Sequence, residues 1–445
     1  MGPEFFDPVS AADFPETRLR YRHDVAARSI GLAGLTDEAW TDHFGRFKPL
    51  EDNLKQPLAL RYHGHQFRHY NPDIGDGRGF LFAQMKDDQG RYLDLGTKGS
   101  GQTPYSRRGD GRLTLLGGIR EVLATRYLDY MGVNTSKSLS LIETGEALQR
   151  GDEPSPTRSS VLVRLSHSHI RFGTFQRLAF LEQRDNLEAL VSYCCRYYYP
   201  DCMTAQDLFE AVLQASADCV ASWMAAGFVH GVMNTDNMNI TGESFDYGPY
   251  RFLPTLQSSF TAAYFDQHGL YAFGRQPEAM YWNLGQLAQS LSLITDDKPL
   301  IAAMDHFANH YRERLCHHVF RRLGLARQNL EADTAFVLAT FKYLEESQTP
   351  WPQFWHDWRG GGGQKTTALA SPNGEFYKGE AFDDWYGMVS KYTANMSGFE
   401  TQRPPSLLYE EIGALWSPID ERDDWSSFHE KVKSFQPSSA LMVGV

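Results

Sequence analysis

Cysteine is scarce in this chain, with five among 445 residues. Their spacing matches no zinc-ligand pattern, and so few cysteines cannot form a dense disulfide framework. Both facts exclude the small disulfide-rich class of proteins and favour a reducing compartment. We interpret the cysteines as mostly buried small hydrophobic residues: Cys194, Cys195, Cys202, Cys219 and Cys316.

Long apolar runs and an excess of positive charge are also missing. No stretch approaches 18 consecutive apolar residues, so we expect no membrane span. Residues 1–16 are acidic and lack both the hydrophobic region of a signal peptide and the arginines of a transit peptide, which predicts a cytoplasmic protein. The formal net charge is -12, so we expect no nucleic-acid partner.

The composition that remains is that of a large globular protein. Hydrophobic residues make up 42% of the chain and aromatic residues 13%. A chain of 445 residues can bury a large core, and we expect it to form two or three domains or lobes. An acidic protein can still bind a nucleotide where Arg, Lys and a divalent metal gather, so any such site must be local.

The stretch 228–249, FVHGVMNTDNMNITGESFDYGP, carries the most specific chemical pattern. Asn237 follows His230-Gly231 at the spacing found in the catalytic loop of small-molecule kinases, and Asp246 follows in an Asp-x-Gly. In such enzymes this Asn and this Asp hold magnesium. The alternative is a pair of ordinary polar turns, because Asn, Asp, Gly and Pro dominate turns.

Val232 stands where a kinase loop has its proton-accepting Asp. Valine cannot accept a proton, so the sequence disfavours ordinary kinase chemistry without disfavouring metal or nucleotide binding. Asp236, beside Asn237, is the nearest carboxylate that could replace the missing base.

A Gly-rich stretch precedes this loop by more than a hundred residues. Two apolar segments, 79–85 and 91–98, flank a KDDQG turn and predict a β-hairpin that ends at Lys98. The next residues, GSGQTPYSRRGDGR, begin with Gly99 and Ser100 and contain four glycines. Backbone N–H groups freed by glycine, with Lys and Arg nearby, suit a polyphosphate. The stretch matches neither the Walker A nor the dinucleotide-binding pattern.

Residues 112–131 have apolar side chains at helical spacing and predict a helix, with Glu121 away from the apolar stripe. Kinases orient phosphates with a Lys at a strand end and a Glu on the next helix, which suggests a pairing of Lys98 with Glu121. The alternative is a solvated Glu121, the commoner outcome for a single helical glutamate.

Arg164 and Arg171 lie seven positions apart around two histidines, after an expected surface loop at 146–160. If a strand turns at Ser168, both guanidinium groups can face one pocket and bind phosphate. Arg164, between Val163 and Leu165, looks buried and would need an anion; for Arg171 a surface position is the alternative. Two more histidines, in His63-Gly64-His65, favour hydrogen-bonded structural roles over metal binding because no third ligand follows.

The rest of the chain is expected to be mostly helical. Short amphipathic helices are predicted in residues 1–56, and a long helix with a capping box at Thr204 leads into the loop at 228. The run Gly360–Gly363 predicts a flexible linker or hinge. Further helices are expected at 277–294, 298–323 and 329–347.

Taken together, these motifs resemble the selenoprotein O (YdiU-like) family. The matching segments are GSGQTPYSRRGDGR, IREVLATRYL, SHIRFGTF and HGVMNTDNM followed by DYGP, over about residues 58–291. The resemblance implies an α+β, two-lobed protein-kinase-like fold. Its parts would be an N-terminal extension (1–57), a β-containing N-lobe (58–190), a helical C-lobe (191–350) and a C-terminal extension (351–445).

The resemblance also implies an activity, the transfer of AMP from ATP to Ser, Thr or Tyr hydroxyls of protein substrates with Mg2+ or Mn2+. ATP would bind in an orientation flipped relative to ordinary kinases. Asp236 would be the catalytic base, and Asn237 and Asp246 would hold the metal. The nucleotide-binding residues would be Lys98, Gly99, Ser100, Asp110, Gly111, Glu121, Arg164 and Arg171.

The chain departs from the family pattern in three places. Arg68 stands where members commonly have Gly, and Gly269-Leu270-Tyr271 where many have Gly-Arg-Tyr. The last residues, SSALMVGV, hold no Cys or selenocysteine, so we expect no redox control through a C-terminal disulfide. An ordinary kinase and a non-catalytic nucleotide-binding scaffold remain the alternative functions. Val232 disfavours the kinase and favours the scaffold.

Overall fold

The computed structural model describes residues 2–151, 153–396 and 403–435, so the final residues SSALMVGV lie outside it. The strands are β1 (Phe6–Pro8), β2 (Arg18–Arg22), β3 (Leu58–Leu60), β4 (Gly64–Gln66), β5 (His69–Asn71), β6 (Leu81–Lys86), β7 (Tyr92–Lys98), β8 (Leu113–Thr114), β9 (Lys137–Leu148), β10 (Thr157–Ser166), β11 (Phe228–Val229) and β12 (Arg251–Phe252). The helices are α1 (Asp24–Ser29), α2 (Asp37–Phe44), α3 (Leu115–Tyr130), α4 (Phe172–Phe180), α5 (Arg184–Tyr197), α6 (Ala205–Ala226), α7 (Gln276–Leu291), α8 (Asp297–Met304), α9 (Phe307–Leu323), α10 (Leu330–Ser347), α11 (Trp351–Asp357), α12 (Lys365–Leu369), α13 (Glu380–Val389), α14 (Tyr409–Arg422) and α15 (Ser426–Ser434).

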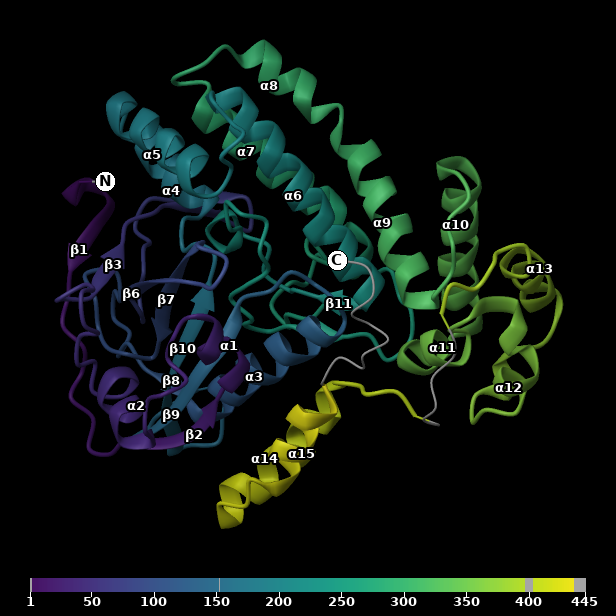
Figure 1. Cartoon of the computed structure of the whole chain (residues 1–445), viewed down its shortest axis with the longest axis horizontal. Coiled ribbons are helices and arrows are strands. Elements are labelled where there is room, and N and C mark those ends of the chain that lie inside the picture. The colour runs from purple at the N-terminus through teal and green to yellow at the C-terminus, as the bar shows by residue number, and fades with distance from the viewer. Residues whose placement is uncertain (1, 152, 397–402, 436–445) are drawn as a thin grey trace.

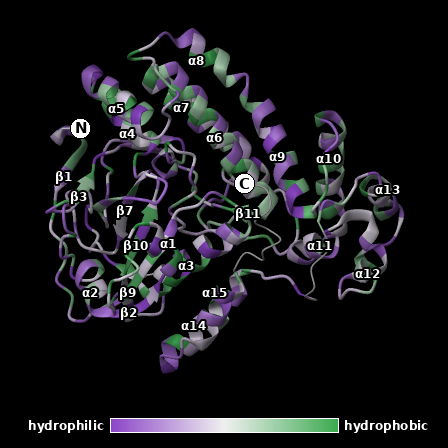
Figure 2. Ribbon diagram, in the orientation of Figure 1, coloured by the Kyte–Doolittle hydropathy of each residue, from purple (hydrophilic) through white to green (hydrophobic). Residues whose placement is uncertain are grey.

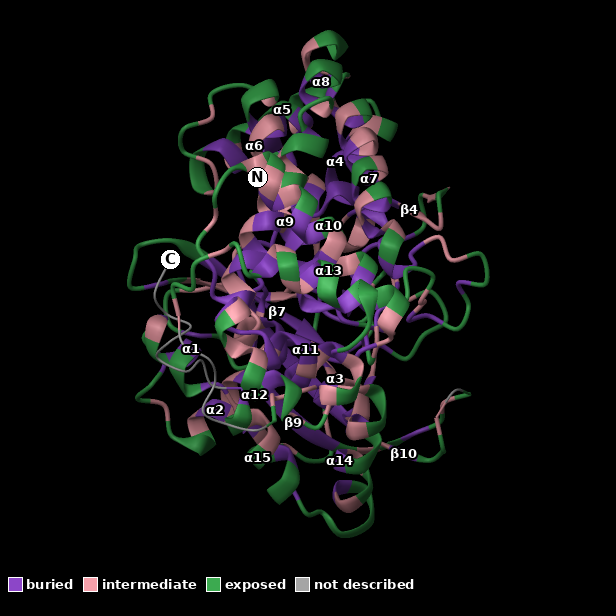
Figure 3. Cartoon of the chain, turned by 90° about the vertical axis from the view of Figure 1, so that its right-hand side faces the viewer, coloured by how far each residue is buried: buried purple, intermediate pink, exposed green. Residues whose placement is uncertain are grey.

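The structure is mixed α/β, with a sheet in the N-terminal region and helices in the C-terminal region (Figure 1). The main sheet runs in the order β1-β3-β6-β7-β10-β9-β2, and β8 pairs with β10. All of its pairs are antiparallel. Figure 2 shows hydrophobic residues on the strands of this sheet, and Figure 3 shows buried residues in the middle of the molecule.

The predicted hairpin is confirmed as β6 and β7, which pair around a turn where the Asp87 carboxylate accepts from the backbone N–H of Arg91 at 2.8 Å. The short helices expected near the N-terminus are confirmed as α1 and α2. The surface loop expected at 146–160 is shorter than predicted. Thr157 pairs with Leu148, so both β9 and β10 extend into that range.

In the helical region, α6 has the predicted capping box at Thr204 and ends at Gly227 in the left-handed conformation, φ 69°. The single helix expected at 298–323 is wrong, because the chain turns at Asp305 and His306 between α8 and α9. The helix α9 runs alongside α6 (Figure 1). No helix of the described residues is both long enough and apolar enough to cross a membrane.

The glycine run is not a flexible linker. Gly361 begins a 3-10 helix that ends at Gln364, and Gly360 and Gly361 have φ of 98° and 69°, where side chains are strained. A Cβ on Gly361 would lie 2.6 Å from Cδ2 of Leu325. The missing side chain of Gly361 therefore permits close packing against Leu325. Leu325 belongs to a core cluster that also contains Trp351, Trp355, Trp358 and Trp385.

Both ends of the described chain pack back onto the sheet region. β1 and β2 form its two edges, against β3 and β9. The helices α14 and α15, which follow the helical region in sequence, lie near α3 and β2 (Figure 1).

Candidate active site

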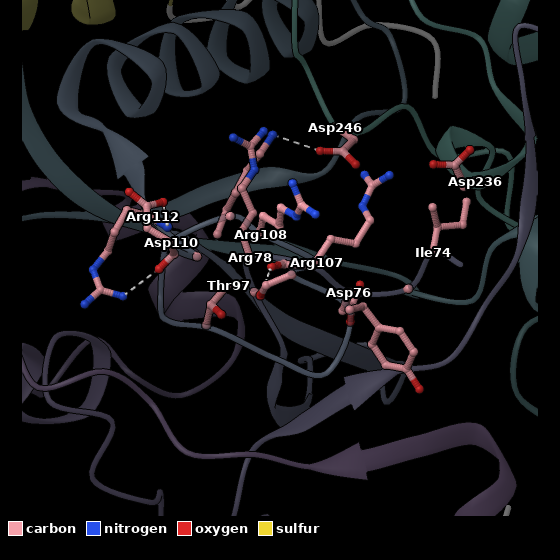
Figure 4. A pocket seen from close by; sticks show the side chains of 18 of the residues that line it. Ile74, Asp76, Arg78, Thr97, Arg107, Arg108, Asp110, Arg112, Asp236 and Asp246 are labelled. Carbon is pink, nitrogen blue, oxygen red and sulfur yellow. Dashed lines mark hydrogen bonds and ion pairs between the residues drawn. The ribbon is translucent and has the colours of Figure 1, made fainter. Parts of the chain in front are cut away.

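A cavity of about 690 Å³ lies where the sheet meets the loops of the helical region. Its walls come from the turn after β5, the ends of β7 and β10, the Gly-rich stretch and the loop at 228–249. Figure 4 shows Asp236 and Asp246 on one side of this cavity and Asp110 with Arg112 on the other. The charged residues that line it are Asp76, Arg78, Lys98, Arg107, Arg108, Asp110, Arg112, Arg150, Arg164, Arg171, Asp236 and Asp246.

Asp246 is surrounded by cations. One carboxylate oxygen, Oδ1, lies 2.8 Å from Nζ of Lys98 and 3.4 Å from a guanidinium nitrogen of Arg164, and Oδ2 lies 4.0 Å from Arg171. Burial would raise the pKa of Asp246, but Lys98, Arg164 and Arg171 together hold it well below its usual value. Its backbone has φ 65°, a conformation that non-glycine residues rarely adopt. Where they do adopt it, the residue often belongs to a functional site.

Lys98, at the end of β7, also forms an ion pair with Glu121 of α3. The Lys98 and Glu121 side chains are 7% and 1% exposed, so the alternative of a solvated glutamate is wrong. The helix α3 begins at the Thr114 N-cap, whose hydroxyl accepts from the backbone N–H of Gly117, and packs against β9 and β10. That packing places Glu121 over the strand that carries Lys98.

Arg164 and Arg171 enter the same cavity from the end of β10 and the start of α4. Their side chains are both 4% exposed, so the surface alternative for Arg171 is also wrong. The guanidinium carbons lie 5.6 and 5.0 Å from the centre of the Phe245 ring, which supports them by cation–π contact. Arg171 also donates from Nε to the backbone carbonyl of Asp236 at 2.9 Å and lies 3.5 Å from Asp76.

Asp236 has the opposite environment from Asp246. It lies in a short 3-10 helix (Thr235–Asn237), and its Oδ1 is shielded from solvent without a hydrogen-bond partner among the described residues. Burial raises the pKa of Asp236 to about 6, although Arg171 opposes the rise. A carboxyl group with this pKa exchanges a proton near neutral pH, as a general base must.

The strand β4 packs tightly against the loop that carries Asp236. A Cβ on Gly64 would lie 3.0 Å from Oδ1 of Asp236, so glycine permits the approach. The hydroxyl of Thr235 accepts from the backbone N–H of His65 at 2.7 Å. The two histidines have the expected hydrogen-bonded roles, His63 with the Tyr70 hydroxyl at 2.8 Å and His65 with Gln176 at 2.7 Å.

Asn237 does not line the cavity as its neighbour Asp236 does. Its side-chain N–H donates to the backbone carbonyl of Val232 at 2.9 Å, which fixes the amide plane and the direction of its oxygen. No group of three or more His, Cys, Asp or Glu among the described residues could hold a metal ion. Mg2+ binds one or two protein ligands and completes its shell with phosphates and water, so it needs no such group, and the assignment of Asp246 and Asn237 to the metal stays a prediction.

The Gly-rich stretch divides into two parts. Asp110 and Gly111 line the cavity, and Asp110 pairs with Arg150 at 2.8 Å. Gly99 and Ser100 do not line it. Gly99 has φ 88° and Ser100 is fully buried with its hydroxyl 2.5 Å from that of Thr97, so both shape the turn out of β7.

Sequence inspection missed several cavity residues. Asp76 and Arg78 lie in a Gly-flanked turn, and Arg107 and Arg108 lie in the Gly-rich stretch. The three glycines around Asp76 and Arg78, at positions 75, 77 and 79, were the available signal, because such a turn exposes backbone and charge to a ligand. Arg107 has φ 55°, so the stretch holds one of these arginines in a strained conformation.

Comparison with known proteins gives a consistent set of relatives. The model of the family described as protein adenylyltransferase SelO matches residues 1–436. Proteins named protein nucleotidyltransferase YdiU are 42% identical in Synechocystis sp. (98% of this chain, 96% of the relative) and 43% in Gloeobacter violaceus (99% and 94%). The relative of that name in Vibrio cholerae is 38% identical, over 79% of this chain and 71% of its own length.

Proposed function

This chain belongs to the protein adenylyltransferase SelO family and is a protein nucleotidyltransferase, and from that premise we propose that it transfers AMP from ATP to hydroxyl groups of proteins. The observation that carries this proposal is the pair of aspartates in one cavity. One is held ionised by three cations, and the other has a raised pKa and an unpartnered oxygen.

In the proposed reaction a Ser, Thr or Tyr hydroxyl oxygen attacks the α-phosphorus of ATP. The bond from that phosphorus to the α,β-bridging oxygen breaks, and diphosphate leaves with the bonding electrons. Oδ1 of Asp236 accepts the hydroxyl proton, since it is the carboxylate oxygen of this residue that lacks a partner among the described residues. The products are an AMP-protein ester and diphosphate.

The cations of the cavity stabilise the phosphates. Lys98, Arg164 and Arg171 converge on Asp246, so an ATP phosphate group placed beside that carboxylate would receive charge-assisted hydrogen bonds. Glu121 keeps the Lys98 ammonium oriented. Arg78, Arg107 and Arg108 offer further positive charge along the cavity wall.

Asp246 and Asn237 would hold the divalent metal, Mg2+ or Mn2+. Bound there, the metal would supply positive charge beside the phosphates and the leaving diphosphate. Asp246 suits this role because its carboxyl group stays ionised, and the Lys98 ammonium can turn from Asp246 toward a phosphate when ATP and metal enter.

A flipped ATP explains why Val232 is tolerated. If the α-phosphate faces the incoming hydroxyl, the base must approach from a different direction, and Asp236 supplies a carboxylate four residues further along the same loop. We propose with this a kinase-like arrangement, in which residues 58–190 form the N-lobe and 191–350 the C-lobe, with extensions 1–57 and 351–445.

Two labelled nucleotides test the proposal. ATP labelled at the α-phosphate should transfer its label to protein, and ATP labelled at the γ-phosphate should not. Label from the γ-phosphate alone would establish a kinase instead. Tight ATP binding without transfer of either label would establish a scaffold. The Asp384→Asn variant, altered at an exposed position on α13, is the matched control for an aspartate substitution.

A further inference from the structure

Arg120, the neighbour of Glu121 on α3, ties that helix to residues 246–250, which begin with Asp246 and are called here the metal-binding loop. A guanidinium nitrogen of Arg120 donates to the backbone carbonyls of Gly248 and Tyr250 at 3.2 and 3.3 Å. In return, the Tyr250 hydroxyl donates to the backbone carbonyl of Arg120 at 2.8 Å. These bonds reach the chain two and four residues after Asp246. They join the two carboxylates, Glu121 and Asp246, that share the Lys98 ammonium.

A residue of the C-terminal hairpin, defined as α14 and α15, covers this junction. Tyr409, the first residue of α14, places its ring 3.6 Å from the guanidinium carbon of Arg251 and 5.8 Å from that of Arg120. Arg120 and Arg251 repel each other, and Arg120 lowers the pKa of Arg251 after the larger effect of burial. The face of the Tyr409 ring attracts both cations, and Glu410 adds a weaker attraction to Arg251.

The far end of the C-terminal hairpin is fastened to the sheet. Asp423, in the turn between α14 and α15, accepts from Arg20 of β2 at 2.9 Å and from Arg158 of β10 at 2.7 Å. Phe435, just after α15, packs on Tyr127 of α3 with ring centres 4.9 Å apart. The hairpin thus lies along α3 and contacts the strands beside it, and its first residue reaches the metal-binding loop.

We propose that the C-terminal hairpin is a built-in clamp that holds α3 against the metal-binding loop, and that Tyr409 and Arg120 are positioning residues for the nucleotide and metal site. With the clamp in place, Glu121 stays on Lys98 and Asp246 stays where the metal must bind. With Tyr409 removed, the repulsion between Arg120 and Arg251 loses the ring that offsets it, and the hydrogen bonds from Arg120 to the loop after Asp246 weaken. This proposal rests on the proposed function, on AMP transfer for its kinetic readout and on the metal site at Asp246 for its binding readout.

The experiment compares Tyr409→Ala with Tyr409→Phe and with Tyr281→Ala. Tyr281 is a similarly exposed tyrosine on α7, 43% against 49% for Tyr409, and packs on Phe307 away from the junction. For Tyr409→Ala we expect the rate of AMP transfer at saturating ATP to fall about tenfold, because the lost contact has the strength of a cation–π pair. The Mg2+ concentration for half-maximal rate should rise severalfold. Tyr409→Phe keeps the ring and should stay near wild type.

The clamp is overturned if Tyr409→Ala matches wild type or Tyr281→Ala in both measurements, or if Tyr409→Phe falls as far as Tyr409→Ala. The Arg120→Ala background gives a second test. There Tyr409→Ala should add little further loss, because without Arg120 the ring no longer holds two cations together, and full additivity would contradict the proposal.

A binding measurement separates this proposal from the proposed function. Calorimetry of ATP binding with and without Mg2+ reports the metal-dependent gain in affinity without any transfer. That gain should shrink in Tyr409→Ala and persist in Tyr409→Phe. If the wild type transfers no AMP, the proposed function fails, but a shrunken gain in Tyr409→Ala still supports the clamp and an unchanged gain still rejects it.

Discussion

The segments around Asp236 and Asp246 lie close in the chain and line one cavity, yet they shift the pKa of their aspartates in opposite directions. At Asp246 three cations lower the pKa, and the side chain is bound to them at 2.8 to 4.0 Å. At Asp236 burial dominates, the pKa rises to about 6, and Oδ1 is unpartnered among the described residues.

The difference supports the two proposed roles. A carboxyl group that stays ionised at every physiological pH can hold a metal, and one that titrates near neutral pH can accept a proton. Pairs of acidic groups whose surroundings push their pKa values apart commonly divide the work of a site in this way. Arg171 touches both segments, through the backbone carbonyl of Asp236 and the carboxylate of Asp246, so it connects the two environments.

Removing the ionised member should have the largest effect. In Asp246→Asn the metal loses its charged ligand, and Lys98, Arg164 and Arg171 lose their anion. We expect AMP transfer to fall roughly 10³-fold, the several kcal/mol that metal stabilisation supplies. Transfer of α-phosphate label measures it, with Asp384→Asn as control. Retention of more than a tenth of wild-type activity would break the assignment.

Removing Asp236, the aspartate that titrates near neutral pH, should lower the rate of AMP transfer less, because it affects proton transfer and not metal binding. In Asp236→Asn the hydroxyl loses its base, and we expect the rate to fall roughly 10²-fold while ATP affinity stays within about twofold of wild type. Rate and affinity are measured on the same protein preparation. An affinity loss as large as the rate loss would mean that Asp236 binds the nucleotide instead.

Changing the residue that joins the two segments should have the smallest effect. Arg171→Met removes a cation that lowers the pKa of Asp236, so the pH at half-maximal activity should move upward. The rate at pH 7 should fall about tenfold, because less Asp236 is ionised at that pH and because the phosphates lose the contact with Arg171. Arg177→Met, in the helix α4 that begins directly after Arg171, is the control, and an unmoved or lowered midpoint in Arg171→Met would contradict the electrostatic account.

Much of the fold followed from local patterns. The β6–β7 hairpin, the capped helix α6 and the helix around Glu121 each depend on neighbouring residues, so periodicity and turn residues were enough to predict them. The break between α8 and α9 and the packed turn at Gly361 depend on tertiary packing, which a window of sequence does not contain.

The site shows the same division. The order of Lys98 and Glu121 in the chain predicted their contact, since a strand end followed by a helix brings such residues together. The contact of Arg171 with Asp76 joins residues on different elements, and no spacing rule predicts it. In His63-Gly64-His65 the histidines are the residues with recognisable chemistry, but it is the glycine whose missing side chain makes room for Asp236.

The pH dependence of AMP transfer in single turnover, with ATP and Mg2+ saturating, tests the division between the two aspartates most directly. Because Asp236 must be ionised to act and its pKa is raised to about 6, the rate should rise about tenfold from pH 5 to pH 7, with ATP affinity nearly constant. The Asp236→Asn variant should lose this inflection. A wild-type rate independent of pH over that range, or the same inflection in Asp236→Asn, would contradict the account.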